Sequence, residues 1–382
     1  MLELLNLYLR KGIMKKHLIF AGGGHSHIHS LSNLDKFLDA GCDVTVVNKS
    51  QYHYYSGMGP GLLSGYYNVE DARFNIKEIV ESSICRFIEA EVVKIIPGQK
   101  KIILSDNSEL YYDVISFNTG SEIISLPVSG DVKNLYPVKP IENISLIRDK
   151  VAGFNKKMDI AVIGGGAAGV EIAANLNEFV RKKRAEAEIS LISREHLLQG
   201  YNEPFYRKTL NNLEHNGIHI YEYRNVEMVD SDNIIFSSGE KLNYDLAVNA
   251  SGVKPSMIFS VSGMKTDEDG GLRVNKYLQS MDYPEIFAGG DCISFEPVLN
   301  KAGVYAVREG MLLYRNLLSH IKEMELEEFK PQESYLSILN IGFNKGIMLW
   351  KGKVFSGALP FYFKYYLDSK FMKKYKKIHG GR

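Results

Sequence analysis

Short apolar runs that lead into glycine-rich turns dominate the hydrophobic pattern of the first part of the chain. Residues 16–21 (KHLIFA) form one such run, which continues directly into Gly22-Gly23-Gly24. A segment of helical length ends near Gly41, and residues 43–48 (DVTVVN) form a second apolar run. This order predicts a strand, a glycine turn, a helix and a parallel strand, which together make one β-α-β unit.

The same succession occurs again in the middle of the chain. Residues 158–163 (MDIAVI) lead into Gly164-Gly165-Gly166, a helix is expected through Phe179, and residues 188–192 supply the next strand. A repeat of a whole supersecondary unit is stronger evidence than either copy alone. The chain is therefore expected to contain two nucleotide-binding units of one plan.

A shorter repeat follows each unit. Asp113 and Asp245 each follow a tyrosine, and a glycine stands seven residues later, at Gly120 and Gly252. The stretch before each aspartate has turn signals between apolar runs, which predicts an antiparallel hairpin. A further run that ends in glycine, EIFAGGD at residues 285–291, comes late in the chain. The first domain is therefore expected to be completed after the second has been inserted.

These patterns predict an α/β fold with two Rossmann-like dinucleotide-binding domains and a small C-terminal α+β appendage. We expect the first domain at residues 14–125 and 263–329, the inserted second domain at 126–262, and the appendage at 330–382. The appendage begins with the short strands SYLSILNIG, GIMLWKG and KVFSG and ends in an aromatic, basic tail.

Composition narrows the classes of protein further. The 382 residues are 45% hydrophobic and 24% charged, which excludes disordered, collagen-like and coiled-coil chains. Cys42, Cys85 and Cys292 stand too far apart for a disulfide framework or a cysteine zinc cage. Residues 1–13 make a poor signal peptide, so Met14 is an alternative start, and no apolar run is long enough to span a bilayer. We expect a cytoplasmic protein with no nucleic-acid partner.

Both glycine turns fit a pyrophosphate, which needs backbone N–H groups at a helix start without a Cβ in the way. Gly164, Gly166 and Gly169 complete the pattern in the second unit, whereas His27 replaces the third glycine in the first. We expect the first helix to pack less closely on its strand, and His25 and His27 to lie near phosphate. His25, His27 and His29 would fan across different helix faces, so no metal site is predicted.

The residues at the end of each second strand bear on the choice of cofactor. A carboxylate usually stands there to bind the ribose hydroxyls. Here Asn48 and Lys49 follow the first copy, and Ser193 and Arg194 follow the second. An uncharged residue beside an arginine favours a 2′-phosphate, so NADPH is at least as plausible as NADH. The alternative is that Arg194 is only a solvated surface charge.

Longer motifs carry a resemblance to a known family. The order GGGHSH, YHYYSGMGPGLLSG, FNTGS, GGGAAGVEIA, NASG and IFAGGDC resembles FAD- and pyridine-nucleotide-dependent oxidoreductases with two dinucleotide-binding domains, the glutathione reductase-like plan. It is most similar to type II NADH dehydrogenase-like flavoproteins, including the flavoprotein domain fused to selenophosphate synthetase. The motifs AGVYAVREG and FKYYLDSKFMKKY support the closer match.

The resemblance implies a role for each site residue. FAD is expected in the first domain and NAD(P)H in the second, with hydride passing from NAD(P)H to FAD. Glu171 is expected near the nicotinamide as the catalytic residue, in the first turn of its helix, where the helix dipole also favours a carboxylate. The residues expected at FAD are Gly22, Gly24, His25, Ser26, Asn48, Lys49, Val92, Thr119, Gly120, Gly290 and Asp291. Those expected at NAD(P)H are Gly164, Gly166, Gly169, Arg194 and Gly252.

The electron acceptor stays open at this point. Type II NADH dehydrogenases resemble one another in an AQxAxQ helix start, and the matching stretch from Gly303 to Arg308 lacks both glutamines. Cys292 alone cannot form the disulfide that dithiol chemistry needs, and we interpret it as a buried structural cysteine. Three functions remain: a quinone oxidoreductase at the membrane surface, a soluble reductase of a selenium- or sulfur-linked acceptor, and a non-catalytic flavin-binding redox sensor.

The C-terminal tail gives the membrane hypothesis its support. Residues 361–382 hold seven Lys and Arg side chains and one acid, Asp368. An apolar stripe at helical spacing, flanked by these lysines, predicts peripheral attachment to an anionic membrane, at the inner face of the cell membrane. The alternative is that the stripe packs on the protein's own body or on a second subunit of a homodimer. The residues of this stripe are Phe363, Leu367, Phe371, Tyr375 and Ile378.

Overall fold

The computed structural model describes residues 15–332 and 334–376, which divide into two compact units. The first unit comprises residues 15–53, Asn75–Gly120 and Pro255–Lys330. The second comprises Tyr54–Phe74, Ser121–Lys254 and the described residues from Pro331 onward. Residues 1–14, including Met14, and residues 377–382, including Ile378, lie outside the described residues.

The two units do not follow the domain limits expected from the sequence at every point. Leu62 and Leu63 belong to the expected first domain, yet they pack in one hydrophobic core with helix α7 (Ala167–Lys183) of the second unit. Leu339 and Ile347 of the expected appendage are buried in the same core. Burial of these apolar side chains therefore ties both segments to the second unit.

The first unit is built on a five-stranded parallel sheet of order β21-β9-β1-β2-β5. Strand β1 lies in the centre and pairs with β2 and β9, and its residues Leu18 to Ala21 are fully buried. Strand β21 pairs with β9, so the late run that ends in glycine completes the first sheet, as predicted. The strands of this sheet are β1 (Lys16–Ala21), β2 (Cys42–Asn48), β5 (Arg86–Glu89), β9 (Val114–Phe117) and β21 (Ile286–Ala288).

The single helix expected after the first glycine turn is divided into two short helices, α2 (Ile28–Leu31) and α3 (Leu34–Asp39). The break lies where Ser32 Oγ donates to the carbonyl of Ile28 and Asn33 Nδ2 donates to that of His29. Such side chains compete with the regular hydrogen bonds of a helix. The remaining helices of the unit are α5 (Ile76–Ser82), α9 (Ile258–Val261) and α10 (Gly303–Ile321).

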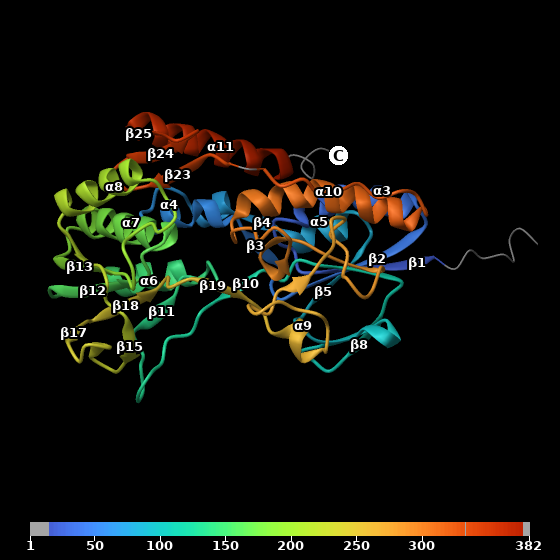
Figure 1. Cartoon of the computed structure of the whole chain (residues 1–382), viewed down its shortest axis with the longest axis horizontal. Coiled ribbons are helices and arrows are strands. Elements are labelled where there is room, and N and C mark those ends of the chain that lie inside the picture. The colour runs from blue at the N-terminus through green and yellow to red at the C-terminus, as the bar shows by residue number, and fades with distance from the viewer. Residues whose placement is uncertain (1–14, 333, 377–382) are drawn as a thin grey trace, which may run out of the picture. The chain divides into compact units, whose positions relative to one another are not determined.

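The second unit repeats the plan with a parallel sheet of order β11-β18-β12-β13-β14. Helices α7 and α8 lie on one side of this sheet and the hairpin strands β15 and β17 lie on the other (Figure 1). The strands are β11 (Leu135–Pro137), β12 (Met158–Ile163), β13 (Ala187–Ile192), β14 (Ile218–Tyr221) and β18 (Leu246–Asn249). The helices are α4 (Gly59–Leu63), α6 (Asn143–Ala152), α7, α8 (Glu203–His215) and α11 (Ala358–Lys376).

The predicted hairpins and the C-terminal meander are confirmed as three antiparallel sheets of three strands. No helix among the described residues is long and apolar enough to span a bilayer. The strands of the first unit's hairpin sheet are β6 (Val92–Ile96), β7 (Lys101–Leu104) and β8 (Glu109–Tyr111). Those of the second unit are β15 (Val226–Val229), β16 (Asn233–Phe236), β17 (Lys241–Asn243), β23 (Ser337–Asn340), β24 (Gly346–Trp350) and β25 (Lys353–Gly357).

Candidate functional site

The first glycine turn packs against the end of β9 through Asn118, a residue that the sequence did not single out. A Cβ on Gly22 would lie 2.2 Å from the Asn118 carbonyl oxygen, and a Cβ on Gly24 would lie 2.2 Å from Asn118 Oδ1. Asn118 Oδ1 also accepts from the backbone N–H of Ser26 at 3.1 Å, and Asn118 Nδ2 donates to the Gly289 carbonyl at 2.6 Å. Asn118 thus joins the turn to the ends of two neighbouring strands.

Ser26 supplies the observation that fits FAD in this unit. Its side chain is fully buried, and its Oγ has no hydrogen-bond partner among the described residues. A buried hydroxyl without a partner is costly, and an oxygen of a bound pyrophosphate would satisfy it. Thr119 and Gly120 follow β9, at the end of the sheet that also carries the glycine turn. The φ of Gly120 is +73°.

His27 does not lie free beside a phosphate. It is fully buried, its Nδ1 lies 2.6 Å from the Gly22 carbonyl oxygen, and its Nε2 lies 2.8 Å from Ser116 Oγ. Burial lowers the pKa of His27 to about 4, so the ring is neutral near pH 7. His27 is therefore a packing residue whose two ring nitrogens both have protein partners, and its place near phosphate stays a prediction.

The other residues expected at FAD occupy different environments. Asn48 Oδ1 accepts from the Gly23 N–H at 2.9 Å, so this side chain orients the glycine turn itself. Lys49 is exposed, and Val92 is buried in β6. His25 Nδ1 lies 3.2 Å from His53 Nε2. Within the described residues, no group of three His, Cys, Asp or Glu side chains is placed to hold a metal ion.

Gly290 and Asp291 line a cavity of about 240 Å³ in the first unit. Glu309 of α10 borders the same cavity, is 2% exposed, and accepts from the Gly290 N–H. Burial raises the pKa of Glu309 to about 7, although the Gly290 hydrogen bond lowers it. Sequence reasoning missed Glu309, because an acid inside an amphipathic helix gives no signal of burial on its own.

In the second glycine turn, Gly164 and Gly169 pack against backbone atoms, whereas the position of Gly166 is open. A Cβ on Gly164 would lie 2.1 Å from the Ala250 carbonyl oxygen, and a Cβ on Gly169 would lie 1.7 Å from the Gly164 carbonyl oxygen. At Gly166, the N-cap of α7, a Cβ would meet no protein atom within 4 Å. The helix start is therefore open to a ligand, as the close approach of a pyrophosphate requires.

The strand end that should distinguish NADH from NADPH carries charges of both signs. Ser193 is buried, while the side chain of Arg194 is 76% exposed and lies 3.9 Å from the carboxylate of Glu195. Arg224 follows β14, and its backbone N–H donates to the Ser193 carbonyl at 2.9 Å. Gly252, whose φ is +126°, follows β18. The placement of Arg194 is compatible with a 2′-phosphate and with a plain surface charge.

Glu171 lies just beyond the first turn of its helix, not within it as the sequence predicts. It is the fifth residue of α7, whose first turn holds no acid, so the helix dipole does not explain it. Its Oε1 accepts from the Asn340 N–H at 2.7 Å. Burial raises the pKa of Glu171 to about 7, and the positive charge of Lys364 lowers it in part. Glu171 can therefore gain or lose a proton near neutral pH.

A buried ion pair stands beside Glu171 in the second unit. Lys364 Nζ lies 2.9 Å from Asp368 Oδ2 and donates to the Gly57 carbonyl at 2.7 Å. Asp368 is 5% exposed, and burial raises its pKa while Lys364 lowers it. Because the pair is mutually satisfied, these charged groups can remain on the inner face of α11.

The three cysteines are free and buried. Cys292 Sγ lies 3.3 Å from the Gly289 carbonyl, and burial raises the pKa of each thiol to about 11. All three are therefore thiols rather than thiolates near pH 7, and thiolate is the form needed for nucleophilic sulfur chemistry.

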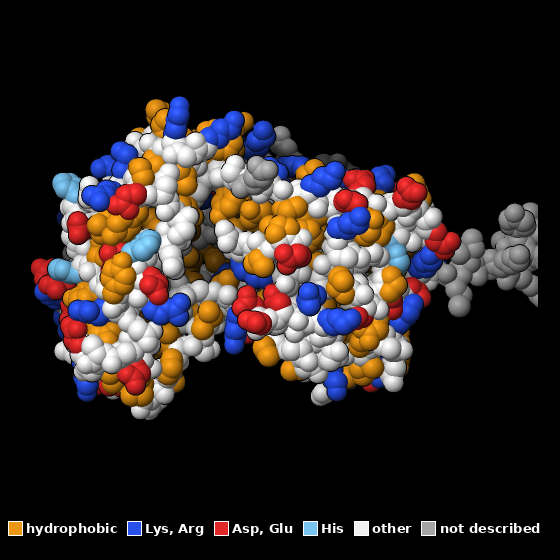
Figure 2. Space-filling view, in the orientation of Figure 1, with side chains coloured by type: hydrophobic (Ala, Val, Ile, Leu, Met, Phe, Trp, Pro, Cys, Tyr) orange, Lys and Arg blue, Asp and Glu red, His pale blue; other side chains and the backbone are white. Residues whose placement is uncertain are grey.

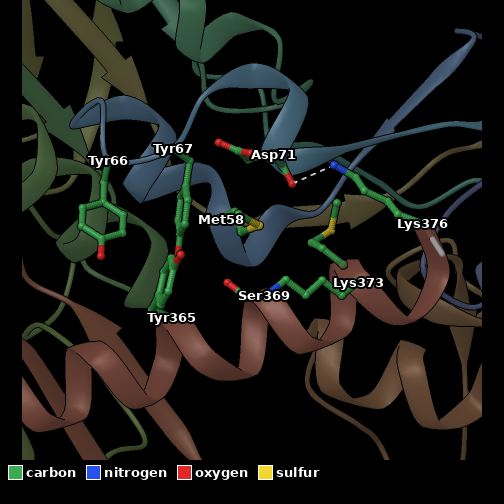
Figure 3. A pocket seen from close by; sticks show the side chains of 9 residues that line it. Met58, Tyr66, Tyr67, Asp71, Tyr365, Ser369, Lys373 and Lys376 are labelled. Atoms are coloured by element: carbon green, nitrogen blue, oxygen red, sulfur yellow. Dashed lines mark hydrogen bonds between the residues drawn. The ribbon is translucent and has the colours of Figure 1, made fainter. Parts of the chain in front are cut away.

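A larger cavity of about 610 Å³ lies within the second unit, between the segment 58–71 and α11 (Figure 3). The rings of Tyr67 and Tyr365 are nearly parallel, at 8° and 5.9 Å between centroids. Aromatic rings, thioethers, hydroxyls, one carboxylate and two ammonium groups thus share one cavity, which suits a flat ring with polar substituents. The lining residues are Met58, Tyr66, Tyr67, Asp71, Tyr365, Ser369, Met372, Lys373 and Lys376.

The apolar stripe expected along the C-terminal helix is divided between two faces of α11. Phe363 and Leu367 are exposed, whereas Tyr375 is 2% exposed and Phe371 stacks on Tyr55 at 4.6 Å. The periodicity failed here because the buried face includes the Lys364–Asp368 pair. The outer face is instead aromatic and apolar, formed by Leu359, Tyr362, Phe363, Tyr366 and Leu367.

Known proteins resemble this chain over most of its length. Ferroptosis suppressor protein 1 of Xenopus tropicalis is 27% identical over 352 residues, which cover 88% of each chain. The type II NADH:quinone oxidoreductase of Staphylococcus aureus (strain NCTC 8325 / PS 47) is 22% identical over 390 residues, which cover 93% of this chain and 95% of the relative.

Solved structures confirm the predicted fold. NDH2 from Plasmodium falciparum in complex with NADH superposes with a TM-score of 0.81 at 18% identity, over 96% of this chain and 97% of the other. The sulfide:quinone oxidoreductase of Aquifex aeolicus gives 0.79 at 17% identity, over 95% and 92%. The family model for the pyridine nucleotide-disulphide oxidoreductases matches residues 16–311. The chain belongs to this family of NAD(P)H-dependent flavin oxidoreductases, and its cofactors are FAD and NAD(P)H.

Proposed function

We propose that this chain passes electrons from NAD(P)H to a quinone at the surface of a membrane. The observation that carries the proposal is the 610 Å³ cavity, whose aromatic rings, thioethers and polar groups suit a quinone ring. The cavity borders α11, whose outer face is apolar and aromatic. Similarity to type II NADH:quinone oxidoreductases supports the same acceptor.

The nicotinamide side of the reaction depends on the second glycine turn and on Glu171. The open start of α7 at Gly166 receives the pyrophosphate of NAD(P)H, and Arg194 pairs with a 2′-phosphate. FAD, when bound by the first unit at Gly22, Gly24, Ser26 and Asp291, supplies the centre that accepts hydride. Glu171, whose carboxyl gains or loses a proton near neutral pH, orients the nicotinamide through hydrogen bonding.

The membrane side depends on the outer face of α11. Lys and Arg side chains lie along the upper margin of Figure 2, where Figure 1 shows α11. Lysines flanking an exposed aromatic face are typical of helices that lie in a membrane interface. Each basic group close to an anionic leaflet contributes about 1 kcal/mol. A quinone dissolved in the bilayer would then reach the cavity along the same helix.

A sulfur-linked acceptor has less support. Sulfide and persulfide chemistry on cysteine needs a reactive thiolate, and the three thiols here are buried with raised pKa. The quinone proposal needs no cysteine.

Anaerobic reduction followed by mixing with acceptor tests the proposal. NADPH or NADH should bleach the flavin, and short-chain benzoquinone or naphthoquinone should restore the oxidised spectrum with turnover. Bleaching without reoxidation by either quinone would contradict the proposal. A flavin that stays oxidised under millimolar NAD(P)H would favour the redox-sensor alternative.

Co-sedimentation with vesicles tests the membrane part. Wild-type protein should bind anionic vesicles at low salt and dissociate as salt rises, because exposed charges are screened within about 8 Å at physiological salt. Serine substitutions at Leu359, Phe363 and Leu367 should abolish binding while leaving the inner face of α11 intact. Equal binding of wild type and variant would contradict attachment by this face.

A further inference from the structure

Of the two lysines that line the large cavity, Lys373 has no hydrogen bond or ion pair among the described residues. Tyr365, Ser369 and Lys373 recur every fourth residue, so they lie on one side of α11 and face the cavity (Figure 3). Met58 and Tyr67 lie across from them. A ring held between these walls would therefore place its polar substituents toward α11.

The other charged groups of the cavity are engaged. Lys376 Nζ donates to the carbonyls of Glu70 and Asp71, the second at 3.3 Å. Asp71 Oδ2 accepts from the Asn68 N–H at 3.0 Å, in a capping box that closes a short helical turn. Lys373, by contrast, has no hydrogen bond or ion pair to any residue between 15 and 376 that the structure describes.

The chemistry of quinone reduction requires a proton donor beside the acceptor. The balanced reaction is NAD(P)H + H⁺ + quinone → NAD(P)⁺ + hydroquinone, so one proton beyond the hydride must reach a quinone oxygen. As electrons arrive, negative charge develops on that oxygen, and a nearby ammonium stabilises it. A hydroquinone is a phenol, with an acidity near the value of about 10 for tyrosine, and a lysine ammonium has about 10.4. Transfer of a proton from lysine to such an oxygen is therefore nearly balanced in free energy.

We propose that Lys373 is a catalytic residue that binds a quinone oxygen in this cavity and donates its proton to that oxygen as it is reduced. The inference rests on the proposed function and names the acceptor-side residue for it. The N–H bond of the Lys373 ammonium breaks and the O–H bond of the hydroquinone forms. Because Lys373 is exposed, water restores the ammonium after each turnover. Ser369, one turn earlier, donates a second hydrogen bond to the ring substituent.

Neighbouring lysines provide a matched test in the full-length, FAD-loaded protein. Lys374 is also exposed but lies over the Tyr375 ring at 4.9 Å and does not line the cavity. Lys373→Met should lower kcat for a short-chain naphthoquinone by about tenfold or more, since general-acid catalysis contributes about 10²–10⁴-fold and this site is open to water. Lys374→Met should stay within about twofold of wild type, because it removes the same charge from outside the cavity.

Two further readouts separate catalysis from simple binding or misfolding. The rate of flavin reduction by NAD(P)H should be unchanged in Lys373→Met, because the change lies on the acceptor side. Lys373→Arg keeps the charge but gives up its proton far less readily, so its kcat should fall between those of wild type and Lys373→Met.

The outcomes are decisive in either direction. Three results would overturn the assignment. Lys373→Met could keep the wild-type kcat for quinone, its loss could be confined to KM, or Lys374→Met could lose as much kcat as Lys373→Met does. Wild-type protein whose flavin is reduced by NAD(P)H but that reduces no quinone would overturn the proposed function and this inference together. Wild-type turnover with an unaffected Lys373→Met would overturn only the role of Lys373.

Discussion

The two units solve the same packing problem at their glycine turns in different ways. In the second unit, Gly169 lets α7 approach so closely that a Cβ would lie 1.7 Å from the Gly164 carbonyl oxygen. In the first unit, the corresponding carbonyl of Gly22 lies 2.6 Å from the His27 ring instead. One unit joins helix and strand by removing a side chain, and the other joins them through a buried, neutral imidazole. A missing glycine therefore need not abolish this type of turn.

Placing histidine at the third glycine position of the second unit should have the largest effect on stability. Gly169→His would force a side chain against the backbone of Gly164, so we expect the free energy of unfolding to fall by more than about 3 kcal/mol, at the upper end for overpacking. Thermal unfolding monitored by circular dichroism measures the loss, and flavin reduction by NAD(P)H should disappear with it.

Gly166→Ala is the control for that substitution. Its Cβ meets no protein atom within 4 Å, so stability should fall by no more than about 1 kcal/mol, the usual cost of alanine at an N-cap, while the KM for NAD(P)H rises. Equal destabilisation by both substitutions would show that the packing difference between these glycines is unimportant.

His27→Ala removes the imidazole that joins helix and strand in the first unit. The change opens a cavity beside Phe20 and leaves the Ser116 hydroxyl without its partner, at a cost of about 2–3 kcal/mol. It should also alter the dependence of stability on pH. The folded-state pKa of about 4 lies below the unfolded value of about 6.5, so folding favours the neutral ring.

That stabilisation is complete above about pH 6.5 and is lost as the pH falls toward 4. The difference in unfolding free energy between wild type and His27→Ala should therefore shrink as the pH is lowered from 7 to 4. Urea titrations at each pH measure it, and a constant difference would argue against a buried neutral histidine.

Asp291→Ala tests the first unit at its FAD site rather than at its glycine turn. Loss of one acceptor for a flavin hydroxyl should weaken FAD retention by about 1–3 kcal/mol. Dialysis followed by absorbance at 450 nm measures the retained FAD. Asp269→Ala is the matched control, because Asp269 lines the same cavity but is exposed. Equal retention in both variants would remove Asp291 from the FAD site.

The smallest effect is expected at the exposed end of β13. Arg194→Glu should reverse a preference for NADPH over NADH, by about tenfold in the ratio of kcat/KM, because it repels a 2′-phosphate. Arg207→Glu on α8 changes the same charge in the same unit and should leave the ratio unaltered. If the wild type favours NADH, Arg194 is a surface charge.

Local patterns predicted much of the fold because β1, β12 and β21 are short apolar runs that each lead directly into glycine. The residues that hold the ends of these strands in place were harder to predict. Asn118 and Glu309 act through contacts with residues more than fifteen positions away, which no local pattern records. The faces of α11 were misassigned because a buried Lys364–Asp368 pair resembles a solvated one in sequence.

The division of each unit into three chain segments has a consequence for synthesis on the ribosome. Strand β9 receives its second neighbour only when β21 has emerged, since Ile115 pairs with Ile286. Until then β9 lacks a partner on one side, and strands with an unpaired side recruit foreign strands. The second unit waits similarly for β23 to β25, which pack in its core. Neither unit can finish before the other has begun, so folding is expected to be largely post-translational and to depend on protection of the nascent edge.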